Sequence, residues 1–272
     1  MKPKLFQHEN LTCAWAQAFV SVFDHPRHGP LVVNVSGFTS ESPEENASLA
    51  ATLDEILRAQ ERPVTIRQTA MTIFPFDTWE RRGRPAVVPL SEYYLQHMLP
   101  RLKARNHKNS RGTYFQRMVS FTGVNGKTPG DSPIKTVNQL EHIVRIWNNH
   151  RAKGGSERES ALQVGIFDPA KDHTGSPLQG FPCLQQVGFS VDAEDKLTVI
   201  GFYPSQYLVD RAYGNYRGLC HLGVFMAREM RLRFGGLSCF VAHPLPGSVP
   251  KRELHELYRQ ARALVAETEV SA

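Results

Sequence analysis

The stretch of sequence that decides the fold runs from residue 181 to residue 215 and reads FPCLQQVGFSVDAEDKLTVIGFYPSQYLVDRAYGN. Apolar residues alternate with polar or small ones through residues 186–191, which is the period of a half-buried strand. Residues 192–196 are polar enough for a turn, and residues 197–202 read as the returning strand. An apolar stripe at helical spacing follows Asn215. The stretch therefore predicts a hairpin headed by Cys183 and followed by a long helix.

Length and composition indicate an ordinary globular protein. With 272 residues, 41% hydrophobic and 21% charged, we expect a single α/β domain over residues 1–272. No apolar run approaches the length of a membrane span, and the N-terminus lacks the apolar core of a signal peptide. The cysteines form no C-x-x-C pair, which argues against a zinc site or a disulfide framework; they are Cys13, Cys183, Cys220 and Cys239. We expect a cytoplasmic protein with reduced thiols.

The order of several short motifs resembles the active-site half of the thymidylate synthase and pyrimidine nucleotide hydroxymethylase superfamily. Members carry Pro-Cys before a strand, then a strand begun by Lys-Leu, a Ser, and an Asn that opens a long apolar helix. The corresponding residues here are Pro182-Cys183, Lys196-Leu197, Ser205 and Asn215. Upstream, residues 112–117 (GTYFQR) resemble the family's Tyr-x-x-Gln-x-Arg segment, and residues 137–141 (VNQLE) resemble its Asp-Gln helix start. The similarity covers roughly residues 110–245.

The resemblance implies a fold and an oligomeric state. We expect a bent, mixed β-sheet packed on one face by helices near residues 136–149 and 216–233. The other face of the sheet would form a homodimer, as it does in this family.

The resemblance also implies a chemistry. Cys183 would add as a thiolate to C6 of a uracil ring, so that C5 can attack a one-carbon unit carried by 5,10-methylenetetrahydrofolate. The unit would be transferred as methyl or hydroxymethyl, and no sequence feature separates these two outcomes. Asn215 would donate to O4 and accept from N3–H, which selects uracil over cytosine. Ser205 would contact a phosphate or the thiol.

Further substrate contacts follow from the resemblance at weaker matches. Arg27, in a Gly-containing loop, and Arg158, in a partner-exchanged loop, are candidate phosphate ligands. Gln68 falls where the family has a Glu that orders water around the pyrimidine. His243 would hold the ribose hydroxyl, although it is displaced by two positions from the family's His.

Several departures from the family pattern set limits on the substrate. Pro204 stands where the family has an Arg that binds phosphate and acidifies the thiol, and Tyr207 replaces an Asp that contacts the folate. The family's Arg-Arg pair becomes Glu157-Arg158-Glu159. Each hydrogen bond to a charged group contributes roughly 1.5–3 kcal/mol, so losing these cations should weaken the binding of a substrate phosphate. We therefore expect a divergent enzyme rather than an ordinary member of the family.

Three other interpretations stay open. In the first, these residues have only structural roles: Cys183 would fill space in the apolar core, Asn215 would cap its helix and Ser205 would begin a turn. The chain is then a catalytically degenerate member of the fold that binds a nucleotide or a partner. A net charge of +6, with Arg81, Arg82 and Arg84 in one cluster and a second basic cluster in the helix at Arg101–Arg105, leaves nucleic-acid binding as a weaker alternative.

Four segments carry expectations about secondary structure. Ser42 followed by proline and two acids predicts the start of a helix that runs to residue 60. Helix and strand compete over residues 64–75. Residues 79–89 are predicted to form a loop, and residues 91–105 a helix.

Overall fold

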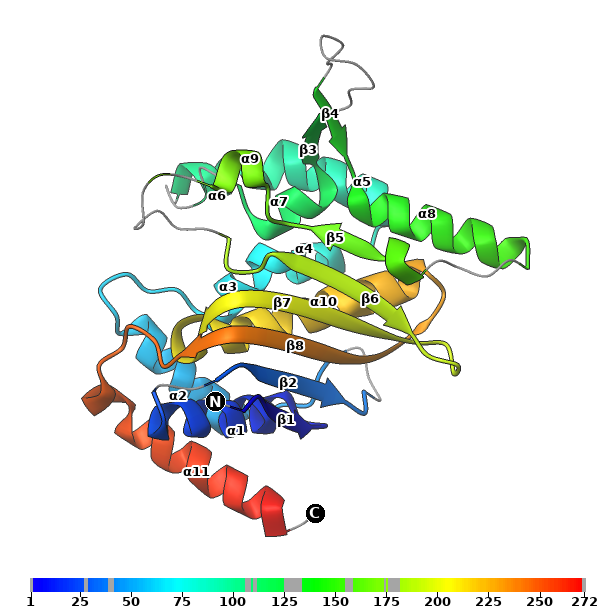
Figure 1. Cartoon of the computed structure of the whole chain (residues 1–272). Helices are drawn as coiled ribbons and strands as arrows, with labels where there is room; N and C mark the ends of the chain where they lie inside the picture. Colours follow the sequence, from blue (N-terminus) through cyan, green and yellow to red (C-terminus); the bar gives the residue numbers. More distant parts are fainter. Residues whose placement is uncertain are drawn as a thin grey trace.

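The computed structural model describes residues 2–26, 29–38, 42–105, 109, 112–124, 134–154, 159–173, 175 and 182–270. Its buried apolar side chains form one continuous core. A six-stranded sheet runs through this core in the order β1 (Lys4–His8), β2 (Leu31–Ser36), β8 (Arg233–Leu245), β7 (Lys196–Tyr207), β6 (Gln186–Val191) and β5 (Gln163–Gly165) (Figure 1). The pairs β1–β2 and β7–β8 are parallel and the other pairs are antiparallel. The expected α/β class with a mixed sheet is confirmed.

The hairpin predicted from the central stretch is present as β6 and β7. Its turn is organised by Asp192, whose carboxylate accepts hydrogen bonds from the backbone N–H groups of Glu194 and Lys196, both at 2.9 Å. The hydrogen bond from Lys196 holds the pKa of Asp192 below its ordinary value. The neighbouring Asp195 takes a left-handed backbone conformation with φ of 58°, which Asp tolerates better than most residues.

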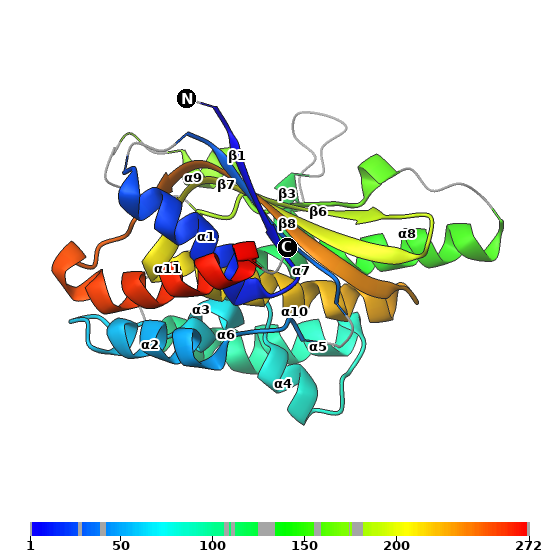
Figure 2. The ribbon, with the colours of Figure 1, turned by 90° about the horizontal axis from the view of Figure 1, so that it is seen from below.

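The helices lie on one side of the sheet, as the view from below shows (Figure 2). The central one, α10 (Tyr213–Glu229), packs on β7 and β8, while α1 (Leu11–Asp24) packs against β1, β2 and α11 (His255–Val270). The other helical segments are α2 (Ala47–Arg58), α3 (Ile66–Ile73), α4 (Phe76–Arg81), α5 (Val87–Tyr93), α6 (Leu99–Arg105), α7 (Tyr114–Val119), α8 (Gln139–Ala152), α9 (Pro169–Asp172), the π-helical turns η1 (Tyr94–Met98) and η4 (Leu208–Ala212), and the 3-10 turns η3 (Glu159–Ala161) and η5 (Lys251–Leu254). A separate pair of strands, β3 (Phe121–Val124) and β4 (Ile134–Val137), stands apart from the main sheet.

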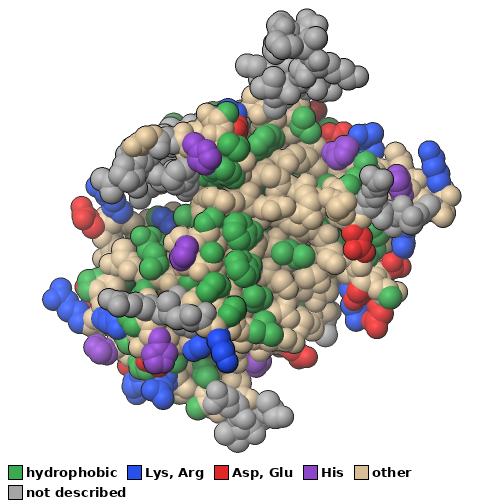
Figure 3. Space-filling view, in the orientation of Figure 1, with side chains coloured by type: hydrophobic (Ala, Val, Ile, Leu, Met, Phe, Trp, Pro, Cys, Tyr) green, Lys and Arg blue, Asp and Glu red, His purple; other side chains and the backbone are tan. Residues whose placement is uncertain are grey.

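The opposite face of the sheet is left without a covering helix in the described part of the chain (Figure 2). Apolar side chains gather over it (Figure 3). Ile200 and Phe240 are 40% and 38% exposed there, and the ring of Phe202 stacks on Phe240 at 5.7 Å. An exposed apolar surface on a sheet is typical of an interaction site.

Two of the secondary-structure expectations are wrong. The helix expected at Ser42 begins at Ala47, because Asn46 accepts the hydrogen bond from the Leu49 N–H and acts as the cap. The residues before it are held elsewhere, since the Glu44 carbonyl accepts from the Leu11 N–H at 2.9 Å. The loop expected over residues 79–89 is confined to residues 82–86, because α4 and α5 occupy both ends of it.

Over residues 64–75, where helix and strand compete, the chain forms the helix α3. A capping box between Thr65 and Gln68 starts this helix. Two glycines of α10 let α3 approach closely, because a Cβ at Gly214 would lie 2.6 Å from the Thr69 Cβ and one at Gly218 would lie 2.7 Å from the Ala70 carbonyl oxygen. The close contact places α3 directly beside the first turn of α10.

Candidate active site

Cys183 lies three residues before β6 and heads the hairpin as expected. The backbone N–H of Gln185 donates to the Phe202 carbonyl at 3.0 Å, which ties this segment to β7. Cys183 is solvent-exposed, whereas the other three cysteines are buried. It is therefore the cysteine most open to a substrate or a reagent, and the interpretation of Cys183 as a buried filler is wrong.

Two side chains from distant parts of the sequence act on the Cys183 thiol. Although the residue is open to solvent, partial desolvation of the sulfur raises the pKa of this thiol, while the charge of Arg211 and a hydrogen bond from the Tyr114 hydroxyl act to lower it. Since burial has the largest effect, the thiol is mostly protonated at neutral pH. The two opposing groups are the kind of partners that stabilise a thiolate once it forms.

Tyr114 is the first residue of α7, and the Thr113 side chain caps this helix by accepting from the Gln116 N–H. Burial, followed by the proximity of Cys183, raises the pKa of the Tyr114 hydroxyl. The hydroxyl therefore keeps its proton and can donate a hydrogen bond to sulfur. Tyr203 of β7 lies in the same group; burial raises its pKa too, and its buried hydroxyl has no hydrogen-bond partner within the described residues.

Arg211 comes from η4, the π-helical turn between β7 and α10. The turn is anchored on several sides: the Trp15 indole N–H donates to the Leu208 carbonyl at 2.8 Å, and the Asp210 carboxylate accepts from the Ser248 N–H at 2.9 Å. The Arg211 guanidinium reaches Thr69 of α3, with 3.5 Å between Nη1 and Oγ1. Single π-turns of this kind are frequent at functional sites.

Asn215 is on α10 and is 2% exposed. No side-chain cap hydrogen bond begins this helix, and η4 continues directly into it, so the interpretation of Asn215 as a helix cap is wrong. A buried amide is suited to reading a ligand, because a ligand that fails to pair with it leaves a polar group unsatisfied at a cost of about 1–3 kcal/mol.

Ser205 and His243 are register partners on the adjacent strands β7 and β8. Ser205 is half-buried and lies inside the strand, so it does not begin a turn. His243 is exposed. The structure therefore brings these two predicted contacts together at one end of the sheet.

Of the three remaining predicted contacts, only Gln68 lies in the described part of the chain. Gln68 is exposed, and its side chain accepts from the Thr65 N–H at 2.9 Å as part of the capping box of α3. In the structure Gln68 stabilises the start of α3, whereas the sequence predicted that it would order water beside the pyrimidine. Arg27 and Arg158 lie outside the described residues.

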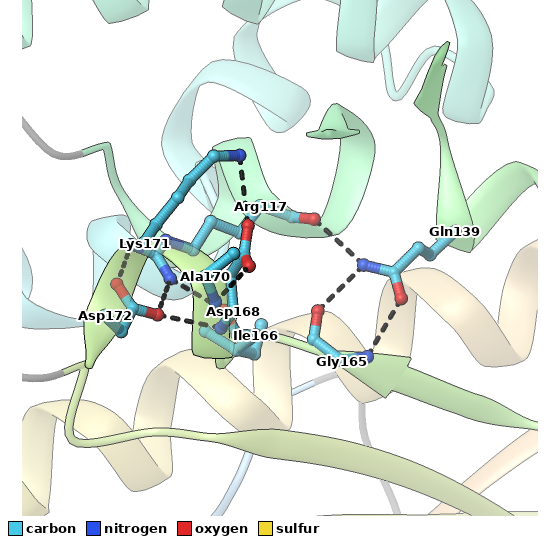
Figure 4. Close-up of polar contacts among 8 residues, drawn as sticks. All are labelled: Arg117, Gln139, Gly165, Ile166, Asp168, Ala170, Lys171 and Asp172. Carbon is cyan, nitrogen blue, oxygen red and sulfur yellow. Dashed lines mark hydrogen bonds and ion pairs between the residues drawn. The ribbon is translucent and has the colours of Figure 1, made fainter. Parts of the chain in front are cut away.

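A buried ion pair holds the helix that carries Tyr114 (Figure 4). Both terminal guanidinium nitrogens of Arg117 donate to the Asp172 carboxylate, with 2.7 Å between Nη2 and Oδ1, and the side chains are 15% and 2% exposed. Arg117 also donates to the Ile166 carbonyl at 2.8 Å. The Gln139 amide bridges the Arg117 carbonyl and the Gly165 backbone, at 2.8–2.9 Å. This network fixes α7 against β5 and α9.

A cavity of about 380 Å³ adjoins the site on the side of η4. Its volume is at the lower end of the range for small-molecule sites. It is lined by Leu57, Gln60, Glu61, Arg62, Val64, Asp210, Arg211 and Ser248. Arg211 therefore belongs both to the cavity wall and to the surroundings of Cys183.

The basic cluster that motivated the nucleic-acid alternative is occupied by local contacts. The Arg81 side chain donates to a backbone carbonyl, Arg82 lies 3.8 Å from the centre of an aromatic ring and Arg84 pairs with a carboxylate; the partners are Asp77, Tyr93 and Glu80. These contacts do not favour a phosphate-binding surface.

Sequence reasoning did not assign Tyr114, Arg211 or Tyr203 to the site. A signal existed for Tyr114, which is part of the segment that resembles the family's Tyr-x-x-Gln-x-Arg. No signal existed for Arg211, because its position depends on the π-turn of η4.

No protein-family model matches this chain, and no curated protein matches its sequence. Within the described residues, no helix is both long and apolar enough to cross a membrane. In the same residues no group of three or more His, Cys, Asp or Glu side chains is arranged to hold a metal ion. The residues around Cys183 are therefore the best indication of what this chain does.

Proposed function

We propose that this chain is a divergent thymidylate synthase-like transferase that adds a methyl or hydroxymethyl unit to C5 of a pyrimidine nucleotide or related pyrimidine. One observation carries the proposal. The accessible Cys183 is hydrogen-bonded to the Tyr114 hydroxyl and lies within the electrostatic influence of the Arg211 guanidinium, and the three residues come from separate parts of the chain. Such partners are what a nucleophilic thiol needs.

The chemistry begins at sulfur. The Cys183 thiolate forms a bond to C6 of the pyrimidine, and the electron pair of the C5–C6 double bond moves toward O4 to give an enolate. C5 then forms a bond to the one-carbon unit, the C5 proton leaves, and the bond from the one-carbon unit to the donor nitrogen breaks, which leaves a methylene group on the ring. Addition of water to this methylene would give hydroxymethyl, and addition of a hydride from the tetrahydrofolate would give methyl; loss of the sulfur–C6 bond then restores the ring double bond. Arg211 stabilises the thiolate by its charge, and Tyr114 does so by hydrogen bonding.

Asn215 would select the base. Its carboxamide can donate to O4 and accept from N3–H of a uracil, whereas a cytosine presents the opposite polarity at both positions. Since the amide is buried, the wrong base leaves polar groups unpaired. Ser205 and His243 lie at the neighbouring strand ends, where a sugar or phosphate would extend.

The residues of the cavity beside η4 fit part of a folate. Leu57 and Val64 provide apolar wall, and Arg62 provides a guanidinium for a carboxylate. These residues would hold methylenetetrahydrofolate, which supplies the one-carbon unit when bound. Arg211 lines this cavity and also acts electrostatically on the thiol.

We further propose that the uncovered sheet face forms a homodimer. Ile200, Phe202 and Phe240 make an apolar strip across β7 and β8. Obligate dimer interfaces are large and apolar, and burying this strip against a second copy would remove it from water. The strip is the described surface best suited to that role.

The test is exchange of the pyrimidine C5 hydrogen in deuterium oxide, followed by NMR. Addition of Cys183 at C6 makes C5 basic, so exchange needs no one-carbon donor. We expect exchange for uridine-type compounds, slower exchange for cytidine-type compounds and none with Cys183→Ser. Cys13→Ala is the matched control, because Cys13 is a buried cysteine of α1, and it should exchange as the wild type does.

A second candidate function has its own supporting observation. Burial raises the pKa of Cys183, and the family's Arg before Ser205 is Pro204, so the resting thiol is weakly activated. A degenerate member would bind a pyrimidine nucleotide or a partner without chemistry. Calorimetric binding of uridine monophosphate with no C5 exchange would favour this alternative. Absence of both binding and exchange would contradict the enzyme.

A further inference from the structure

Strand β7 lies between the two residues that would hold a pyrimidine ring. Its neighbour in the sheet is β6, and Cys183 lies three residues before β6. The Gln185 N–H donates to the Phe202 carbonyl of β7 at 3.0 Å, so the segment that carries Cys183 runs beside this part of β7. The helix α10, which carries Asn215, packs on β7. Buried side chains of β7 just after Phe202 therefore lie between Cys183 and Asn215.

Two polar side chains are buried at this place on β7. Tyr203 directly follows Phe202 and is 0% exposed, and Gln206 is 2% exposed. The Gln206 carbonyl oxygen accepts from the Tyr216 hydroxyl at 2.8 Å, and Tyr216 directly follows Asn215 on α10. Within the described residues, the Tyr203 hydroxyl and the Gln206 amide nitrogen have no hydrogen-bond partner. Buried polar atoms in folded proteins are nearly always paired with protein or with water, so these two atoms indicate a bound molecule.

The geometry of the pyrimidine ring shows which of its groups would face these atoms. In the proposed adduct, C6 is bonded to the sulfur of Cys183 and O4 is paired with Asn215. C5 lies between C6 and C4 in the ring. The methylene group on C5 therefore lies on the ring edge that runs from the thiol to the amide, and Tyr203 and Gln206 belong to the strand beneath that edge.

We propose that the Tyr203 hydroxyl and the Gln206 amide hold the water that adds to this methylene, so that the product is a hydroxymethyl pyrimidine rather than a methyl pyrimidine. The inference rests on the proposed function, because it begins from the adduct between Cys183 and the ring. The amide N–H can donate to the water oxygen, and the hydroxyl oxygen can accept from a water hydrogen. A buried water makes about three hydrogen bonds, and these side chains would supply two of them.

The step needs no reductant. The water oxygen forms a bond to the methylene carbon, the electron pair of the C5–methylene double bond moves toward O4, and one water proton is lost. The electrons then return from O4, the C5–C6 double bond forms, and sulfur leaves C6 as a thiolate that takes up a proton in place of the one lost. Methyl transfer would instead need a hydride, so a bound water at this place favours the hydroxymethyl product.

The experiment follows the water step alone, without any one-carbon donor. The probe is 5-hydroxymethyldeoxyuridine monophosphate in water enriched in oxygen-18, read by mass spectrometry. Addition of the Cys183 thiolate at C6 expels the hydroxyl oxygen as water and regenerates the methylene, and labelled water then adds to it. We expect the nucleotide to gain the heavy oxygen with wild-type protein and not with Cys183→Ser. In a parallel reaction with deoxyuridine monophosphate and methylenetetrahydrofolate, we expect the hydroxymethyl product.

Variants separate a role in binding water from a structural role. Tyr203→Phe and Gln206→Met should each slow oxygen exchange by roughly 2- to 12-fold, which corresponds to the loss of one neutral hydrogen bond. Both variants should slow C5 hydrogen exchange of deoxyuridine monophosphate by less, because that exchange does not use the water. A purely structural role would slow the two exchanges together. The matched control is Tyr258→Phe, which removes a hydroxyl that donates to Asp24 from α11, and it should exchange oxygen as the wild type does.

The inference is overturned if wild-type protein exchanges the C5 hydrogen but not the hydroxymethyl oxygen, or if the product made with the donor is methyl; the proposed function would survive both results. It is also overturned if Tyr203→Phe and Gln206→Met exchange oxygen as fast as the wild type. Tyr203→Phe decides the matter if Gln206→Met does not fold. Absence of C5 exchange in the wild type would remove the proposed function and this inference with it.

Discussion

The ion pair between Arg117 and Asp172 offers the sharpest test of how α7 is held beside Cys183. Asp172→Asn removes the negative charge and keeps the size of the side chain. The carboxylate accepts from both terminal nitrogens of Arg117 and from the Asp168 N–H at 2.8 Å. The substitution replaces one carboxylate oxygen that faces the guanidinium with an amide NH2 group, which is a donor. The Arg117 side chain is only 15% exposed, so its charge is left largely buried without an anionic partner.

The expected loss of stability is about 3–5 kcal/mol, which is the usual cost of breaking a buried pair from one side. Two hydrogen bonds to charged groups at roughly 1.5–3 kcal/mol each give a similar total. For a chain of this size, 1 kcal/mol corresponds to roughly 2 °C in the thermal midpoint. We therefore expect a drop of about 6–10 °C in Asp172→Asn.

Equilibrium unfolding in urea measures the free energy, and calorimetry measures the midpoint. The matched control is Asp195→Asn, which removes the same charge from the pair with Arg151, where the side chains are 47% and 53% exposed. Exposed pairs contribute about 0–1 kcal/mol. Asn also accepts the left-handed backbone of this position.

The reasoning is refuted if Asp172→Asn costs no more than Asp195→Asn. A second check is the double variant Arg117→Met with Asp172→Leu. Because most of the cost comes from the uncompensated guanidinium, removing both charges should recover part of the stability lost in the single variant. A double variant less stable than Asp172→Asn would place the cost in lost packing instead.

Three further predictions follow from the site and its surroundings. Asn215→Ala should reduce the preference for uridine over cytidine by roughly 5- to 150-fold in calorimetry, and an unchanged preference would exclude Asn215 as the base reader. Gly218→Ala should cost about 1–3 kcal/mol in urea unfolding, because its Cβ would lie 2.7 Å from the Ala70 carbonyl oxygen and force α3 away from α10; equal stability would contradict this close contact. Phe240→Glu should convert the dimer to monomer in light scattering, and a wild-type chain that is already monomeric at micromolar concentration would count against the proposed interface.

Much of the local structure could be predicted because it depends on neighbours in sequence. The hairpin of β6 and β7 has the period of two and a polar turn between its strands, and α1 begins after a capping Asn10. The helix expected to begin at Ser42 does not begin there, although the residues have the composition of a helix start. The Glu44 carbonyl instead accepts a hydrogen bond from the first residue of α1. A hydrogen bond between distant parts of the chain thus overrides the local helix signal.

Some residues of the candidate site could also be predicted from local sequence, and others could not. Cys183, Ser205 and Asn215 could be singled out from their spacing within one stretch, since β6, β7 and α10 follow one another along the chain. Gln68 was misplaced because an apolar pattern does not show which face of a helix meets the site. Its side chain is used in the cap of α3.

The sequence by itself determined the class of the fold, the hairpin and the cysteine at its head, because alternation, turns and caps act over a few residues. Only the tertiary structure decided what surrounds that cysteine. Tyr114 and Arg211 lie 69 residues before and 28 residues after Cys183 in the chain, and both act on its thiol. The Arg117–Asp172 network holds the helix that carries Tyr114, and Arg211 belongs to the π-helical turn η4. Electrostatic effects on a thiol depend on distance in space, which the order of residues does not contain.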